Sequence, residues 1–202
     1  MKKLFMLAVA AVLLVSSAKA QMSDITKNLT YGAKVGMNVS NVSNIDNSKN
    51  KVSINLGAFA EWRVSDFLGI QPELLYSRQG LRFDEVDGVK SKTRLNYLNI
   101  PILARLYVLE NLSVDLGPQL GFGLNGKDKA KKDGHTSTEK VKHLNTVDIS
   151  FAIGASYNWD SFIFSARYNL GLSNAIDKDW VGGNNKNHVF QLSVGYRLSD
   201  LF

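Results

Sequence analysis

The sequence predicts an all-β protein: an eight-stranded antiparallel up-and-down transmembrane β-barrel, preceded by a cleavable signal peptide. Three observations lead to this prediction. Apolar and polar residues alternate through eight segments, short and long connections alternate between them, and the large apolar side chains share one face of each segment. The chain of 202 residues is long enough for one such domain. Because it has no Cys, a disulfide framework, a thiolate metal site and a Cys nucleophile are excluded.

Residues 1–20 have the pattern of a secretory signal peptide. Lys2 and Lys3 precede an unbroken apolar run over residues 4–15, which is too short to span a bilayer as a helix. Residues 18–20 (AKA) fit the small-x-small cleavage pattern, although an uncleaved anchor helix is the alternative. We therefore expect a barrel domain over residues 21–202. Without the three lysines of residues 1–20 the formal charge falls from +6 to +3, which is too small to indicate a nucleic-acid partner.

Four strands are predicted in the first half of the mature chain. The first sets Tyr, Val and Met against Gly, Lys and Asn, and the second sets Val, Ile, Leu and Trp against Ser, Asn, Glu and Arg. The third sets Leu, Ile and Tyr against Gly, Gln, Glu and Ser, and the fourth sets Leu and Ile against Asn, Pro, Leu and Arg. Such period-two alternation is typical of strands with two different environments. In order, these strands cover residues 30–42, 52–64, 67–80 and 93–107.

The second half alternates more regularly and predicts four more strands. Leu, Val, Phe, Ile, Tyr and Trp occupy one parity, while Ser, Gly, Asn, Asp, Gln and Arg occupy the other. In order, these strands cover residues 112–125, 145–159, 162–172 and a closing strand from His188 towards the C-terminus.

Three prolines fall inside the predicted strands, namely Pro72, Pro101 and Pro118. Proline cannot donate a hydrogen bond to the sheet and is normally confined to edges or bulges. Since a closed barrel has no edge, we expect a local bulge at each position.

The connections between the strands alternate in length. Short ones lie near residues 65–66, 108–111 and 160–161, and long polar ones cover residues 43–51, 81–92, 126–144 and 173–187. This asymmetry is typical of transmembrane barrels of the bacterial outer membrane, with short periplasmic turns and long extracellular loops. It places both termini on the periplasmic side.

The size of the side chains indicates which face meets lipid. An eight-stranded barrel has a lumen only wide enough to be filled by side chains. Gly, Ser and Asn fit there, whereas the bulky aromatic residues do not, so the apolar face is expected to point outwards. A soluble sandwich or a lipocalin-like carrier would reverse the two faces. Aromatic residues near the short turns are expected to form an interface girdle: Trp62, Phe67, Tyr107, Trp159, Phe162, Tyr196 and Phe202.

Charged residues also recur on the inward parity. Buried charges persist only when they are paired, so we expect an ion-pair network that fills the lumen; a narrow gated pore is the alternative. Glu61, Arg105 and Asp115 are expected nearer the periplasm, and Glu73 and Arg167 near mid-depth. The full expected network is Lys34, Glu61, Arg63, Glu73, Arg105, Asp115, Arg167 and Arg197.

Three sequence blocks give a resemblance to a known family. Residues 71–77 (QPELLYS), residues 97–101 (YLNIP) and Gly117-Pro118 resemble recurring blocks of the PorT-like outer-membrane β-barrel domain family. The likeness covers nearly all of residues 21–202 and implies an eight-stranded barrel in a Gram-negative outer membrane. A secretion role is associated with the PorT branch. The closing strand with terminal Phe202 also resembles the signal read by the barrel assembly machinery, which implies that machinery as a partner.

The residues around each possible chemical motif do not support a nucleotide-binding, metal or catalytic site. Residues 121–128 fit G-x-G-x-x-G, but a solvated loop rather than a phosphate-binding helix is expected to follow them. The histidines show no convergent metal ligands. We therefore predict a non-enzymatic barrel without cofactors. A lipid-modifying enzyme that uses His188 with Ser173 or Asp177 is the alternative from another class.

The long loops are the expected binding regions. The loop over residues 126–144 carries six Lys, which are either simply solvated or contact anionic lipopolysaccharide phosphates or an extracellular or secretion partner. The candidates for contacts with lipid, lipopolysaccharide or a partner are Lys127, Lys131, Lys132 and Trp180.

Overall fold

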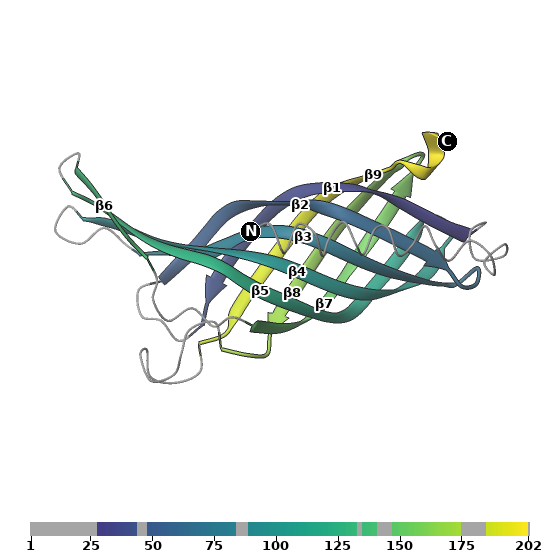
Figure 1. The fold of residues 1–202 in the computed structure, drawn as a ribbon. Helices are drawn as coiled ribbons and strands as arrows, with labels where there is room; N and C mark the ends of the chain where they lie inside the picture. The colour runs from purple at the N-terminus through teal and green to yellow at the C-terminus, as the bar shows by residue number, and fades with distance from the viewer. Residues whose placement is uncertain are drawn as a thin grey trace.

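The computed structural model describes residues 28–43, 48–83, 89–132, 135–140, 147–174 and 185–201. These residues form a closed, elongated barrel of eight antiparallel strands, which confirms the predicted fold class (Figure 1). β1 pairs with β2 and β9, and the pairing of β4 with β5 closes the cylinder. In order around the wall, the strands are β4 (Lys90–Leu109), β3 (Leu68–Phe83), β2 (Ser48–Arg63), β1 (Leu29–Val42), β9 (Asn187–Arg197), β8 (Phe162–Gly171), β7 (Val147–Trp159) and β5 (Leu112–Lys132).

The strands have an apolar outside and a polar inside, as the alternation predicts. In β8, exposed and buried residues alternate without a break: Phe164 faces out, whereas Ser165 and Arg167 face in. Lipid replaces water as the outer solvent, so the exposed apolar side chains are not a defect. We call these outward residues the apolar band; its members include Val35, Met37, Val52, Ile54, Leu56, Leu74, Ile102, Leu120, Phe122, Ile149, Phe151, Ile153, Phe164, Leu170, Leu192 and Val194.

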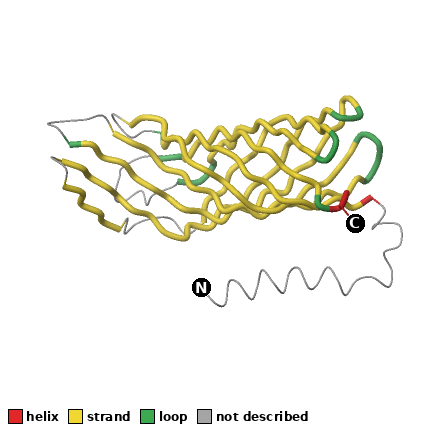
Figure 2. Tube along the Cα trace, turned by 90° about the horizontal axis from the view of Figure 1, so that it is seen from above, coloured by secondary structure: helices red, strands yellow, loops and turns green. Residues whose placement is uncertain are grey.

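The two ends of the barrel differ in the length of their connections (Figure 2). At one end, hereafter the turn end, tight turns at residues 64–67, 110–111 and 160–161 join the strands. Asp160 adopts a left-handed backbone conformation there, with φ of 50°. At the other end, hereafter the outer end, β3, β4 and β5 project well beyond the apolar band, and β6 (His135–Lys140) pairs only with β5.

This projection corrects three of the predicted loops. Residues 48–50, 81–83, 90–92, 126–132 and 135–140 are strand rather than loop. β4 and β5 keep pairing from Asn96 opposite Asn125 out to Lys90 opposite Lys131. The sequence analysis missed these extensions because few apolar side chains continue the period of two there. Leu81 is an exception, since it is buried against Val42 and Phe83.

The expectation of a bulge at each proline is also wrong. Pro72 pairs with Ile102, Pro101 with Gln119 and Pro118 with Phe151, and the register continues unchanged past each of them. An antiparallel residue directs its N–H towards only one neighbouring strand, so each proline removes one hydrogen bond without shifting the pairing. Within the described strands the register shifts elsewhere: between Asn50 and Asn55, between Asn96 and Tyr97, and between Tyr107 and Leu109.

Some inward positions carry large apolar side chains, whereas the sequence analysis expected small residues and paired charges to dominate the lumen. Phe59, Leu75, Tyr97, Leu103 and Ile163 are all buried. Phe59 has room because two glycines face it: a Cβ at Gly32 would lie 2.7 Å from its ring and one at Gly195 would lie 3.1 Å away. The lumen is therefore filled by apolar as well as polar groups.

Candidate functional site

At mid-depth, an ion cluster crosses the full width of the lumen. Glu73 Oε1 accepts hydrogen bonds from Lys34 Nζ at 2.7 Å and from Arg167 Nη2 at 2.9 Å, and its Oε2 accepts from Arg167 Nη1 at 3.0 Å. Glu73 belongs to β3 and Arg167 to β8, which are four places apart in the ring of eight and so lie on opposite walls. The bidentate geometry is the strong form of an Arg–carboxylate pair.

A second cluster lies nearer the turn end and is centred on Arg105. Its Nη1 donates to Glu61 Oε2 at 2.5 Å and its Nε donates to Asp115 Oδ1 at 3.3 Å. Ser113 Oγ accepts from the same guanidinium and donates to Asp115. Arg105 is fully buried, so these contacts take the place of the water that it has lost.

Gln71 joins the two clusters. Its Nε2 donates to Glu73 Oε1 at 2.6 Å, and its Oε1 accepts from Arg105 Nη1 at 3.0 Å. The Glu73 cluster has two cations for one carboxylate, whereas the Arg105 cluster has two carboxylates for one cation. The two excesses cancel only when both clusters are counted, so Gln71 connects the halves of one neutral network. The sequence analysis placed Gln71 on the inward face but did not assign it to the network.

Above the ions, a layer of amides and hydroxyls fills the lumen towards the outer end. Asn55 Nδ2 donates to Asn38 Oδ1 at 2.8 Å, and Gln191 Nε2 donates to Asn55 Oδ1 at 3.2 Å. Asn187 of β9 donates to Gln79 of β3. The described residues therefore close the lumen at three successive levels, which are the Arg105 cluster, the Glu73 cluster and this layer of amides and hydroxyls.

Arg63 and Arg197 do not join this network. Arg63 lies at the turn end, where its guanidinium carbon is 3.6 Å from the centre of the Tyr107 ring and its Nη2 donates to the Asp66 carbonyl. Arg197 donates to the Asp160 carbonyl at 2.7 Å. The structure thus brings together six of the eight expected residues.

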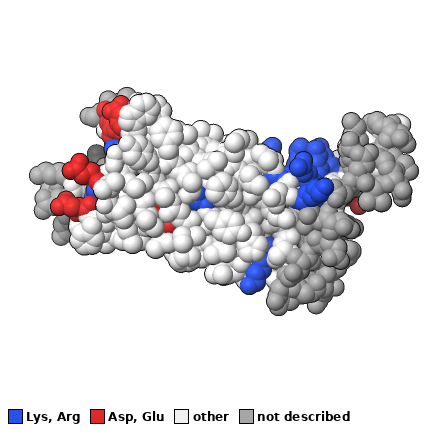
Figure 3. All heavy atoms as spheres, turned by 180° about the vertical axis from the view of Figure 1, so that it is seen from behind, with Lys and Arg blue, Asp and Glu red and all other residues white. Residues whose placement is uncertain are grey.

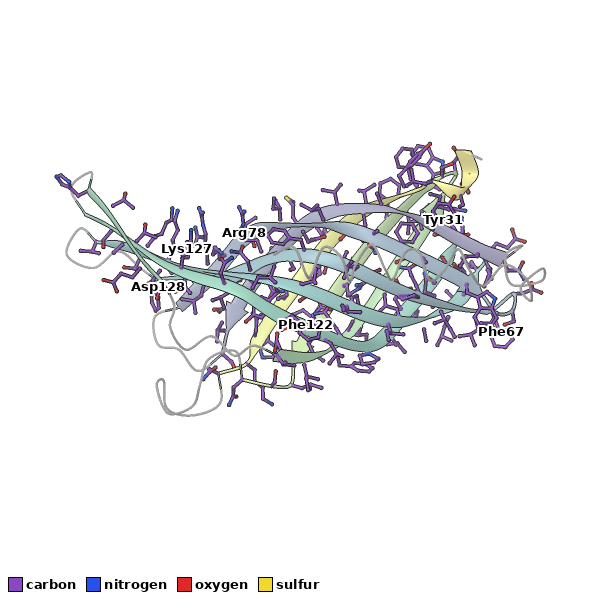
Figure 4. The ribbon with its side chains drawn as sticks, viewed as in Figure 1. Tyr31, Phe67, Arg78, Phe122, Lys127 and Asp128 are labelled. Carbon is purple, nitrogen blue, oxygen red and sulfur yellow. The ribbon has the colours of Figure 1, made fainter. Side chains whose placement is uncertain are left out.

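The aromatic girdle needs one correction. Tyr107 faces the lumen, where its hydroxyl donates to Glu61 Oε1; it shares the parity of Arg105, which fixes this direction. The other described members lie at the turn end, with Phe162 packed edge-on against Tyr196 at 5.2 Å between ring centres. Figure 4 shows Phe67 at this end. Phe202 lies outside the described residues. The described outward-facing members are Trp62, Phe67, Trp159, Phe162 and Tyr196.

Exposed charge is divided between the two ends of the barrel. Figure 3 shows acidic side chains at one end, basic side chains at the other and a mostly uncharged zone between them. At the turn end the exposed acids are Asp66, Glu110, Asp160 and Asp200. At the outer end, β3 and β4 carry four basic residues that the sequence analysis did not single out: two lay in predicted strands, and Arg82 and Lys92 lay in a predicted loop. We call them the basic patch: Arg78, Arg82, Lys92 and Arg94.

The predicted loop candidates have mixed outcomes. Lys127 is exposed on the projecting part of β5, where it is labelled in Figure 4 and pairs with Arg94 of β4. The backbones of Lys131 and Lys132 pair with β6 in the hairpin. Trp180 and the predicted signal peptide lie outside the described residues.

Among the described residues, the positions with predicted chemistry form no catalytic arrangement. Residues 121–128 lie within β5, and strand rather than the expected loop follows them. Ser173 Oγ donates to Asp148 at 2.8 Å, and the His188 ring stacks on Tyr168. Asp177 lies outside the described residues. In the described part of the chain, no group of three His, Cys, Asp or Glu could hold a metal.

A comparison with known protein families agrees with this fold. The family described as "Outer membrane protein beta-barrel domain" matches residues 19–177. The chain belongs to this family. The protein is accordingly an integral barrel of the bacterial outer membrane. No curated protein matches the chain, and no helix among its described residues is both long and apolar enough to cross a bilayer.

Solved structures of similar shape have low sequence identity. The attachment invasion locus protein Ail of Yersinia pestis is 17% identical, with a TM-score of 0.51 over 84% of this chain and 98% of Ail. Ail in complex with the heparin analogue sucrose octasulfate is 18% identical in sequence, with a TM-score of 0.52 over 85% of this chain and 99% of Ail. Neisserial surface protein A is 11% identical in sequence, with a TM-score of 0.48 over 85% of this chain and 97% of its own. At these identities the likeness to Ail shows the fold alone.

Proposed function

We propose that the protein is a non-enzymatic outer-membrane barrel with a closed lumen, whose structural or binding role is performed by its projecting outer end. The observation that carries this proposal is the Glu73–Arg167 pair, which joins opposite walls of the barrel inside a buried polar network. A charged pair of this kind blocks the path that an ion would take. The orientation that fits this role has the turn end in the periplasm and the outer end outside the cell.

A secretion-accessory role is the second candidate, and it rests on the PorT-like sequence blocks. It is compatible with a closed lumen, since an accessory barrel acts through its surfaces. A gated pore fits less well, because opening it would break the bonds of buried ions whose separation is strongly unfavourable. The enzyme alternative has no supporting geometry among the described residues, where Ser173 bonds to a carboxylate rather than to His188.

Conductance in planar lipid bilayers tests the closed lumen. The wild-type protein is expected to give no ion-current steps. The quadruple variant Asn55→Ala/Glu73→Ala/Arg105→Ala/Arg167→Ala is expected to give them, because it truncates side chains at all three levels that close the lumen. Arg197→Ala, a rim variant outside the network, is the control and should stay silent. Insertion is checked beforehand by the shift of the folded barrel on an unboiled gel. Regular current steps from the wild-type protein would refute the closed-lumen proposal.

A further inference from the structure

The basic patch arranges like charges directly opposite one another. Across the β3–β4 ladder Arg82 pairs with Lys92, and across the β4–β5 ladder Lys92 pairs with Lys129. One step closer to the membrane, Arg94 pairs with Lys127. Like charges directly opposite in a sheet are destabilising, so this surface needs compensation from elsewhere.

The described part of the protein does not supply that compensation. None of Arg78, Arg82, Lys92 and Arg94 forms an ion pair within the described residues. Asp128 is the nearest carboxylate in the ladder, and its Oδ1 accepts from Thr93 Oγ1 at 2.6 Å. The described residues therefore leave these four cations without a paired carboxylate.

A pocket of about 320 Å³ gathers these cations around an apolar wall. Val52 and Ile54, which are 64% and 47% exposed, line its lower side and continue into the apolar band. The β2–β3 register shifts between Asn50 and Asn55, and Lys51 reaches through this irregularity to donate to the Gln79 carbonyl. The residues that line the pocket are Lys51, Val52, Ser53, Ile54, Arg78, Arg82, Lys92 and Arg94.

The height of the pocket matches the level of lipid headgroups. On β3 the outward apolar residues end at Tyr76, and Arg78 and Arg82 follow on the same face. A strand tilted by about 45° rises roughly 2.3 Å per residue along the membrane normal. The cations therefore lie on the order of 5 to 14 Å above the edge of the hydrocarbon.

We propose that this pocket binds the phosphate groups of a phosphorylated glycolipid of the outer leaflet, the class to which lipopolysaccharide belongs. The guanidinium groups of Arg78 and Arg94 hold phosphate oxygens through charge-assisted hydrogen bonds, while an acyl chain lies along Val52 and Ile54. A free polyanion shares the phosphate or sulfate chemistry but would leave this apolar wall uncovered. The proposal is independent of whether the lumen is closed.

Native mass spectrometry of the full chain in nanodiscs that contain bisphosphorylated lipid A tests the proposal. The wild-type protein should retain phosphorylated lipid A, and it should retain the enzymatically dephosphorylated lipid less. Arg78→Gln/Arg94→Gln should weaken retention about tenfold or more, because two charged hydrogen-bonding groups are lost. Lys186→Gln/Arg197→Gln removes the same charge outside the pocket, at the outer end and at the turn end, and should change retention less than about twofold.

Three results would overturn the proposal. They are equal retention of phosphorylated and dephosphorylated lipid by the wild-type protein, equal loss in the two double variants, or full competition by a soluble sulfated glycan at the concentration of the lipid. The third result would assign the pocket to a free polyanion. The comparison of the two lipids uses only wild-type protein, so it decides the matter even if a variant fails to fold.

Discussion

Charged side chains are arranged in opposite ways in the lumen and in the basic patch. Inside, every member of the two ion clusters has a partner of opposite sign, and Gln71 joins two clusters whose excess charges cancel. Outside, cations face cations across β3, β4 and β5. The difference follows from the solvent: a buried ion must be paired within the protein, whereas an exposed ion can be compensated by water, salt or a bound anion. Substitutions in the two regions should therefore differ in size and also in sign.

The largest effect is expected for Glu73→Ala. The substitution leaves Lys34 and Arg167 facing each other without a carboxylate in a fully buried site. Loss of one partner of a buried pair typically costs about 3–5 kcal/mol. The measurement is the free energy of unfolding in urea, with the barrel inserted in lipid vesicles.

Two controls sharpen this result. Arg197→Ala removes a half-exposed rim cation and should cost less than about 1 kcal/mol. The quadruple variant Lys34→Met/Glu61→Gln/Glu73→Leu/Arg167→Met removes the Glu73 cluster together with the excess carboxylate of the Arg105 cluster, and should recover most of the lost stability because every remaining ion is paired. A loss below about 1 kcal/mol for Glu73→Ala would show that water reaches the cluster.

The sequence predicted the inside of the barrel better than its outer end, for a physical reason. In the membrane, the contrast between hydrocarbon and lumen imposes a strict alternation, so the parity of Glu73, Arg105 and Arg167 could be read directly. Which of them meet depends on how far each strand is staggered around the ring, and the sequence does not state that stagger. Gln71 therefore escaped assignment to the network.

Tyr107 and the basic patch show two further ways in which the sequence reading failed. Tyr107 was placed in the girdle from its position near a turn, although its parity with Arg105 directs it inwards. Arg82 and Lys92 were read as part of a loop because the charged and polar residues around them interrupt the apolar alternation. The pairing of β3 with β4 brings these basic residues together in one patch, and the sequence alone does not give the register of that pairing.

A moderate effect is expected for Tyr107→Phe. The variant keeps the ring that lies under the Arg63 guanidinium but removes the hydroxyl that donates to Glu61. Hydrogen bonds to charged groups contribute about 1.5–3 kcal/mol, and Arg105 still pairs with Glu61, so a loss near the lower bound is expected. Tyr157→Phe, at an outward-facing position, is the control and should change the free energy of unfolding by less than about 0.5 kcal/mol. Equal effects of the two variants would mean that the Tyr107 hydroxyl adds nothing to the network.

The smallest effect, and one of opposite sign, is expected for Lys92→Glu. The substitution replaces two like-charge contacts, with Arg82 on β3 and Lys129 on β5, by two attractive ones. Cross-strand pairs of this kind contribute roughly 0.2–1 kcal/mol each, so the variant should be slightly more stable than wild type in a zwitterionic detergent free of anionic lipid. The gain should shrink as salt is raised, since exposed charges are screened within about 10 Å at 0.1 M. Adding phosphorylated lipid should then stabilise the wild-type protein more than the variant, which would reverse their order. A variant that is less stable than wild type at low salt would show that the cations are already compensated within the protein, and the contrast between the lumen and the basic patch would disappear.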